Sequence, residues 1–153
     1  MNDALAEREA IAGQVARYAH SFDSHDVEAW VALFTDDGVF EVRLLENDEP
    51  YVRLEGADQL RAFVAGSPPV LHHISSLLFD ELHRDSATTR AVVVGTWSAP
   101  EDGSPAIFTH GTYEQRWAKV EGTWRLAHLL FRSHGYSAAM DEPHGVRPTV
   151  AMS

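Results

Sequence analysis

The spacing of apolar residues changes once along this 153-residue chain, and this change limits the folds that it can adopt. Up to about residue 34, apolar residues recur every three or four positions, which is the period of a helix with one buried face. After about residue 39 they alternate in segments bounded by Gly, Pro, Asn and Asp, as in strands joined by turns. The sequence therefore predicts an α+β fold, with helices first and an antiparallel sheet after them.

Three helices are expected. An apolar stripe that includes Tyr18 places the first helix at about residues 4–22, and residues 23–24 supply capping side chains for a second helix. Residues 35–38 end that second helix, so the first two helices form a hairpin. A shorter third helix is expected within residues 56–66.

The sheet is expected to be a curved antiparallel meander. A hairpin of residues 39–45 and 51–54 precedes longer strands at 70–82, 87–98, 106–120 and 123–134. A sheet of such long strands must wrap around the helices that cover it, leaving a pocket where helices and sheet do not meet. We expect one domain over residues 1–134 and a tail at 135–153 that covers the pocket or a neighbouring subunit.

Composition excludes several classes of function. The chain has 12 Lys and Arg against 23 Asp and Glu, a net charge of −11 that would repel nucleic acid and anionic membranes. No apolar segment is long enough to span a bilayer, and the first residues lack the features of a signal peptide, which favours a cytoplasmic location. Because the chain has no cysteine, disulfides, thiolate nucleophiles and Cys-ligated zinc are excluded.

Motifs for cofactors and metals are absent from the sequence. It contains no G-x-G-x-x-G, G-x-x-x-x-G-K or G-x-S-x-G pattern, so we expect no nucleotide cofactor and no serine hydrolase triad. His-Glu-x-x-His is absent too, and the nine histidines form no ligand pattern with carboxylates. No cofactor and no metal site are therefore expected.

Two regions carry side chains that suit general acid–base chemistry. Tyr18 lies on the buried stripe of the first helix and Asp23 just past its end, and each needs a polar partner if it is buried. A helix-capping role for Asp23 and a core role for Tyr18 agree equally well with this spacing. His72 and His73 open the first long strand on opposite faces, so only one can enter the pocket. Periodicity does not choose between them.

Other strand residues are candidates either for the pocket lining or for cross-strand pairs. Tyr113 shares a strand face with Gln115 and Trp117 that is attractive as pocket lining. The remaining polar and aromatic candidates are Glu41, Arg43, Trp97, His110, His128 and Arg132.

Several segments are together typical of one fold family. They are Tyr18…Phe22-Asp23, Trp30…Leu33-Phe34-Thr35-Asp36-Asp37-Gly38-Val39-Phe40, His72, and Gly111-Thr112-Tyr113 with Glu121-Gly122-Thr123-Trp124-Arg125-Leu126. On these residues the chain resembles the SnoaL-like branch of the nuclear transport factor 2-like superfamily, from about Ala4 to His134. The resemblance implies a cone-shaped α+β barrel with an internal cavity, usually dimerising through the outer face of the sheet.

The resemblance also implies a catalytic site. Scytalone dehydratase, bile acid 7α-dehydratase and hexachlorocyclohexane dehydrochlorinase use a His–Asp dyad, which a Tyr assists in the two dehydratases. Asp23 and His72 match this dyad, and Tyr18 matches the Tyr that precedes the Asp by five residues in the bile acid enzyme. The second catalytic His of scytalone dehydratase falls at or near Trp97, so that enzyme's own substrate is not expected here. The residues expected to contact substrate are Trp30, Phe40, Trp97, Tyr113 and Arg132.

The expected function is that of a cofactor-independent lyase or isomerase, of the dehydratase kind. The substrate would be a mostly apolar cyclic small molecule, such as a polyketide, terpenoid or steroid-like compound. His72 would be the general base, Asp23 would hold its tautomer, and Tyr18 would donate a hydrogen bond to developing negative charge. Two alternatives remain open: a non-catalytic ligand-binding or accessory subunit, and an epoxide hydrolase or polyketide cyclase of the same fold.

A homodimer is expected as well. Helices can cover only one face of a long meander, so its other face needs a partner, and a second copy of the chain is the simplest one. Trp117 or Phe108 is expected to supply that surface.

Overall fold

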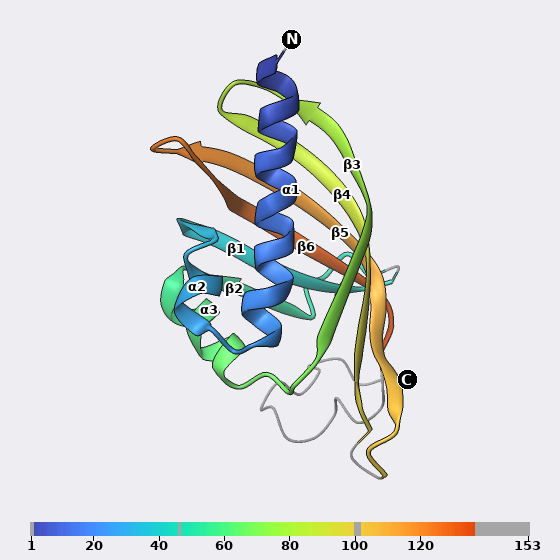
Figure 1. The fold of residues 1–153 in the computed structure, drawn as a ribbon. Helices are drawn as coiled ribbons and strands as arrows, with labels where there is room; N and C mark the ends of the chain where they lie inside the picture. Colours follow the sequence, from blue (N-terminus) through green and yellow to red (C-terminus); the bar gives the residue numbers. More distant parts are fainter. Residues whose placement is uncertain (1, 46, 100–101, 137–153) are drawn as a thin grey trace.

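Three helices and a six-stranded sheet form the part of the chain that this computed structural model describes, residues 2–45, 47–99 and 102–136 (Figure 1). The helices are α1 (Asn2–Asp23), α2 (Val27–Val31) and α3 (Ala57–Ala65). The strands are β1 (Phe34–Leu44), β2 (Val52–Glu55), β3 (Leu71–Leu82), β4 (Ser86–Ser98), β5 (Pro105–Val120) and β6 (Thr123–Tyr136). The predicted α+β class is confirmed, and every predicted helix and strand lies within a few residues of its expected position.

The region between α2 and β1 differs from the prediction. Asp26, not residues 23–24, caps α2, because its side chain accepts a backbone hydrogen bond in the first turn at 3.2 Å. Residues 35–38 do not end a helix but lie within β1, where the register against β6 shifts. A Cβ atom at Gly38 would lie 2.8 Å from the Cβ atom of Phe34, so only a glycine lets this bulge close.

The strand order of the sheet is β2-β1-β6-β5-β4-β3. The hairpin of β1 with β2 and the meander from β3 to β6 are antiparallel, as predicted. The parallel pairing of β1 with β6 was not predicted. The chain leaves β2 at one edge, passes through α3 and enters β3 at the other edge, so the meander brings β6 back beside β1. This crossing sets Val42 of β1 opposite Phe131 of β6.

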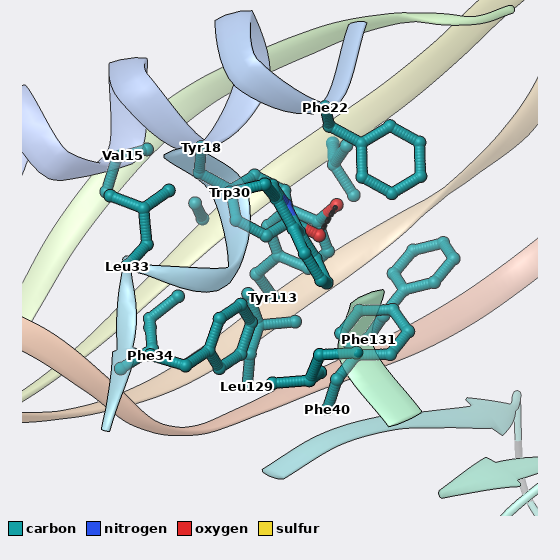
Figure 2. Packing of buried hydrophobic residues seen from close by; sticks show 14 of the residues in the cluster. Val15, Tyr18, Phe22, Trp30, Leu33, Phe34, Phe40, Tyr113, Leu129 and Phe131 are labelled. Atoms are coloured by element: carbon teal, nitrogen blue, oxygen red, sulfur yellow. Dashed lines mark hydrogen bonds between the residues drawn. The ribbon is translucent and has the colours of Figure 1, made fainter. Parts of the chain in front are cut away.

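Helix α1 lies across the concave face of the sheet, with α2 and α3 beside its C-terminal half (Figure 1). Its predicted apolar stripe is buried, since Ile11, Val15, Tyr18 and Phe22 are each at most 6% exposed. These side chains meet aromatic residues of α2, β1, β5 and β6 in one core (Figure 2). Burial of this stripe holds the helix on the sheet.

A bulge in β3 explains why periodicity did not choose between the two histidines of that strand. The register of β3 against β4 shifts around Ser76, whose φ of 55° lies in the left-handed region. Before this point His72 and Ile74 are the half-buried residues, and after it Leu77 and Phe79 take the inner face. Residues on opposite faces of a regular strand therefore share one face here.

The outer face of the sheet corrects one expectation about the dimer. Trp117 and Phe108 are only 2% and 8% exposed, and the Trp117 indole N–H donates to Thr89 Oγ1 inside the core at 2.8 Å. Neither residue can therefore supply an outer contact surface. The exposed large apolar residues on the outer faces of β3, β4 and β5 are Leu71, Leu78, Val92 and Ile107.

Strand β6 runs to Tyr136, two residues beyond the predicted end of the last strand, so the expected tail begins inside the sheet. The rest of that tail, residues 137–153, lies outside the described residues, and its position over the pocket stays a prediction. None of the described helices has the length and the hydrophobicity that crossing a bilayer requires.

Candidate active site

A cavity of about 450 Å³ lies between the helices and the concave face of the sheet. Its lining comes from α1, α3 and all six strands, and most of the side chains are apolar or aromatic. The volume is within the range of small-molecule sites, roughly 300–1,000 Å³. Among the lining residues that the structure describes, none is Asp, Glu, Lys or Arg, so the cavity suits an uncharged ligand.

Asp23 and His72 meet at one side of this cavity, although 49 positions separate them in the chain. Asp23 ends α1 and His72 lies at the start of β3. Asp23 Oδ1 lies 2.6 Å from His72 Nδ1, and Asp23 Oδ2 accepts a second bond from the backbone N–H of His72 at 2.9 Å. The two side chains are only 15% and 10% exposed. Asp23 therefore binds a strand and its imidazole, and does not cap α2.

This contact defines which nitrogen of His72 is available for chemistry. An ionised carboxylate can only accept hydrogen bonds, so Nδ1 carries the proton and Nε2 keeps a lone pair. Aromatic rings hold the imidazole in place, with ring-centre distances of 4.8 Å to Phe22 and 5.9 Å to Tyr18. A base whose orientation is fixed in this way can accept a proton from a ligand in the cavity, which His72 lines.

Two buried phenols lie beside the imidazole. Tyr18 and Tyr113 lie in the same part of the core (Figure 2). Their hydroxyls are 3.5 Å apart, and Tyr113 donates to Tyr18. Burial raises the pKa of Tyr18 well above its usual range, and the neighbouring Tyr113 and Asp23 raise it further. Burial likewise raises the pKa of Tyr113, against the effect of its bond to Tyr18. Both phenols stay protonated at neutral pH. Because the Tyr113 proton is donated to Tyr18, the Tyr18 hydroxyl is the donor that is free for a ligand.

These raised pKa values predict a loss of stability in alkali. In the unfolded chain both phenols ionise near pH 10, while in the folded protein they keep their protons. Stability is therefore complete below pH 10 and falls as the pH rises above it, by up to about 1.4 kcal/mol per pH unit for each phenol. Urea unfolding at pH 9 and pH 11 measures this slope. Tyr113→Phe is expected to remove about half of the fall in the free energy of unfolding that the two phenols cause. A pH slope equal to that of the wild type would show that buried Tyr113 is not one of its causes.

The five residues that the sequence offered as substrate contacts are divided by the structure. Phe40 and Tyr113 line the cavity. Trp30 is 0% exposed and packs behind the lining, on Phe34 and other rings of the core. Trp97 is not among the described lining residues either, because its ring packs on Phe108 at 4.6 Å.

Arg132 also differs from the expectation. Its neighbours Phe131 and Ser133 line the cavity, so alternation along β6 turns Arg132 to the outer face of the sheet. There its guanidinium donates to the backbone carbonyl of Leu45 at 3.2 Å and lies 3.8 Å from Glu114. The strand was predicted, but its register against the neighbouring strands was not, and the register decides the face.

Three other polar candidates form an ion cluster outside the cavity. Glu41 is 1% exposed, and its carboxylate accepts hydrogen bonds from Arg43, from Arg53 at 3.0 Å and from His128 at 3.1 Å. Burial alone would raise the pKa of Glu41, but the bonds from Arg43 and His128 outweigh burial and lower it. Every second residue of β1 from Phe40 onward lines the cavity, so Glu41 and Arg43 point to the opposite face of the sheet. On that face the cluster joins β1, β2 and β6.

Several lining residues were not singled out in the sequence. Phe63 and Phe131 are aromatic residues whose periodicity indicated only burial, since a cavity wall and a solid core show the same pattern. Gly95 lines the cavity as well, and a single glycine in a strand gave no signal. In the ranges that the structure describes, no group of three or more His, Asp or Glu side chains lies close enough to hold a metal ion.

Sequence comparison relates most of the chain to one family. The sequence profile of the SnoaL-like domain matches residues 3–129, which include Asp23, His72 and both buried phenols. A search of curated protein sequences finds no significant match to the chain.

Solved structures share this fold at low sequence identity. A protein of unknown function from Mycobacterium tuberculosis is 26% identical, with a TM-score of 0.77 over 98% of this chain and 80% of that one. A protein from Novosphingobium aromaticivorans described as a scytalone dehydratase is 23% identical, with a TM-score of 0.75 over 100% of both chains. A hexachlorocyclohexane dehydrochlorinase from Novosphingobium barchaimii is 17% identical, with a TM-score of 0.70 over 88% of this chain and 91% of that one.

Proposed function

Because the chain belongs to the SnoaL-like domain family, we propose that it is a cofactor-independent lyase or isomerase of the dehydratase kind. The observation that carries this proposal is the contact of Asp23 with His72 Nδ1 at the wall of an apolar cavity. The protein described as a scytalone dehydratase and the dehydrochlorinase among the similar structures agree with elimination chemistry on this fold. A small uncharged molecule is the substrate class that the lining favours.

In the proposed reaction His72 Nε2 removes a proton from a carbon next to a carbonyl group. The electron pair of that C–H bond moves toward the carbonyl and forms an enolate. Asp23 stabilises the imidazolium that forms, because its carboxylate accepts a hydrogen bond from Nδ1–H, with 2.6 Å between Oδ1 and Nδ1. A water-poor site strengthens this charge pairing.

The phenols supply hydrogen bonds to the developing negative charge. Tyr18, with the support of Tyr113 at 3.5 Å, donates to the enolate oxygen or to a departing hydroxyl group. In a dehydration the enolate electrons expel hydroxide, which takes the proton from imidazolium and leaves as water. In an isomerisation the imidazolium returns its proton to a different carbon. Both routes restore neutral His72 without a cofactor.

The substrate proposed for this site is a mostly apolar cyclic molecule, such as a polyketide, terpenoid or steroid-like compound. The aromatic walls favour rings, and the lack of charged lining residues in the described cavity disfavours carboxylates and phosphates. The hydroxyl or carbonyl group of the ligand would face Tyr18, whose hydroxyl is the free donor of the phenol pair.

A substrate screen in isotopically labelled water tests this function. We expect neutral cyclic β-hydroxy ketones to lose one water, detected by mass spectrometry, at a rate that depends on His72. Oxygen taken up from labelled water would instead indicate the alternative hydrolysis of an epoxide. Formation of a new carbon–carbon bond would indicate a polyketide cyclase. Tight binding without any product would indicate a non-catalytic binding or accessory subunit.

We propose further that the protein is a homodimer that buries the outer face of β3, β4 and β5. Leu71, Leu78, Val92 and Ile107 expose between 42% and 62% of their surface on this face. An exposed apolar surface on a sheet needs cover from solvent, and a two-fold axis lets one surface cover its own copy.

The dimer proposal predicts the effect of a charge on this face. Val92→Asp would place two carboxylates in the apolar contact of each dimer. We therefore expect the dissociation constant of the dimer to rise about a hundredfold. Sedimentation velocity at micromolar concentration measures the mass of the species in solution. Leu5→Asp is the matched control, because Leu5 is 60% exposed but lies on α1. A monomeric wild-type protein would contradict the proposal.

A further inference from the structure

At the position next to His72, the inner face of the sheet carries no side chain. Gly95 of β4 is the register partner of His72 on β3, and both line the cavity. Paired strands lie only about 4.8 Å apart, so Gly95 is the immediate sheet neighbour of the imidazole on this face. The next inward residue along β4 is Val93, so only at Gly95 does the strand present no side chain beside His72.

The backbone conformation does not require a glycine at this position. Gly95 does not have a positive φ, unlike Gly56, Gly103 and Gly122. A glycine within a strand weakens it and often marks a place where another group approaches the backbone closely. A register shift of β4 against β5 lies directly after Gly95, and the glycine also leaves space above the strand.

A side chain at this position would enter the cavity, and the neighbouring residues could not move aside easily to make room for it. An added Cβ atom would lie 3.2 Å from Thr109 Cγ2 and 3.8 Å from the ring of Phe108, and both residues line the cavity. Thr109 cannot rotate its methyl group away freely, because its Oγ1 donates to the carbonyl of Gly135 at 2.9 Å. A methyl group on Gly95 would thus stand above the floor of the cavity.

We propose that Gly95 is a specificity-determining position, whose bare backbone is the surface on which a flat fused-ring substrate lies beside His72. This inference rests on the proposed function of the cavity as a substrate site. A flat ring has two faces that can pack, one on the Gly95 backbone and the other on aromatic side chains of the cavity lining. A saturated single ring is thicker but smaller in extent, and it can occupy the cavity without covering Gly95.

Binding of two neutral probes to Gly95→Ala tests the proposal. We expect 2-naphthol, a flat fused-ring phenol, to bind about tenfold more weakly, which is the effect of one methyl group in a fitted apolar site. Cyclohexanol, a single saturated ring, is expected to keep its affinity. Titration calorimetry gives both dissociation constants, and a purely structural role for Gly95 would weaken both probes alike or neither.

Gly13→Ala is the matched control, because it adds the same methyl group on α1 at a residue that does not line the cavity. There the added Cβ atom would lie 3.5 Å from the Arg17 guanidinium, which is ordinary contact. Both probes should bind this variant as they bind the wild type. Equal loss of 2-naphthol binding in Gly95→Ala and Gly13→Ala would overturn the proposal.

A measurement on the wild-type protein keeps the test open if Gly95→Ala does not fold. In nuclear magnetic resonance spectra, saturating 2-naphthol should shift the Gly95 amide signal and give cross-peaks between its ring protons and the Gly95 α-protons. The signals of Gly13, which does not line the cavity, should stay in place. An unshifted Gly95 signal overturns the proposal, whether or not the protein catalyses a reaction. A shifted Gly95 signal in a protein that converts no compound of the substrate screen would contradict only the proposed function.

Discussion

Replacing His72 with Ala, or Asp23 with Asn, is expected to lower turnover by about a hundred- to ten-thousand-fold in a protein that stays folded. His72→Ala removes the only group that the mechanism uses to accept a proton. Asp23→Asn keeps an oxygen that can accept the backbone N–H of His72, now 2.9 Å from the carboxylate. The neutral amide, however, cannot stabilise the imidazolium, so the loss falls on catalysis rather than on folding.

The measurement is kcat and KM for a substrate found in the screen, together with the free energy of unfolding in urea. His73→Ala is the matched control, because His73 is the next residue of the same strand but is exposed on the opposite face, 3.0 Å from Thr96 Oγ1. We expect this variant to turn over substrate like the wild type. Wild-type turnover in both His72→Ala and Asp23→Asn would refute the mechanism.

Replacing Trp30 with Ala is expected to lower the free energy of unfolding by about 3–5 kcal/mol. The Trp30 side chain is 0% exposed. Its ring centre lies between 4.9 and 6.5 Å from the rings of five aromatic residues. Truncation would leave a large void behind the cavity wall, and the neighbouring rings cannot all move to fill it.

Urea unfolding of Trp30→Ala and Trp97→Ala gives the comparison. Trp97 is only half-buried and packs mainly on Phe108, so its loss should be clearly smaller. The sequence had offered both residues as substrate contacts. If Trp30→Ala weakened ligand binding and left stability unchanged, the sequence interpretation would be right and the packing argument wrong.

Local sequence patterns predicted most of the elements but not how they meet. The helical stripe through Tyr18 and the alternating strands are properties of short segments, and they appear in the structure near their expected positions. The parallel pairing of β1 with β6 depends on where the connection through α3 returns to the sheet, and no local period records that. The register of β6, and with it the outward side of Arg132, depends on the same return.

The candidate site shows the same division. The spacing from Tyr18 to Asp23 placed two polar groups near one helix end, but it agreed equally well with a capping role for Asp23. The capping role belongs to Asp26 instead, because Asp23 has a stronger partner in His72. The choice of His72 over His73 came from the family resemblance, because the bulge at Ser76 hides the alternation on which a local argument relies.

The two hydrogen bonds of Asp23 join the chemistry of the site to the assembly of the fold. One oxygen orients the imidazole, and the other fastens the end of α1 to the first residues of β3. A descendant that gave up turnover and kept the cavity for binding alone would still need an acceptor at position 23. Such a lineage could change the imidazole freely, but it would have to retain a side chain such as Asn or Ser beside the strand. If the proposed activity were lost, we therefore expect the change to begin at His72, while an acceptor at position 23 is retained for the fold.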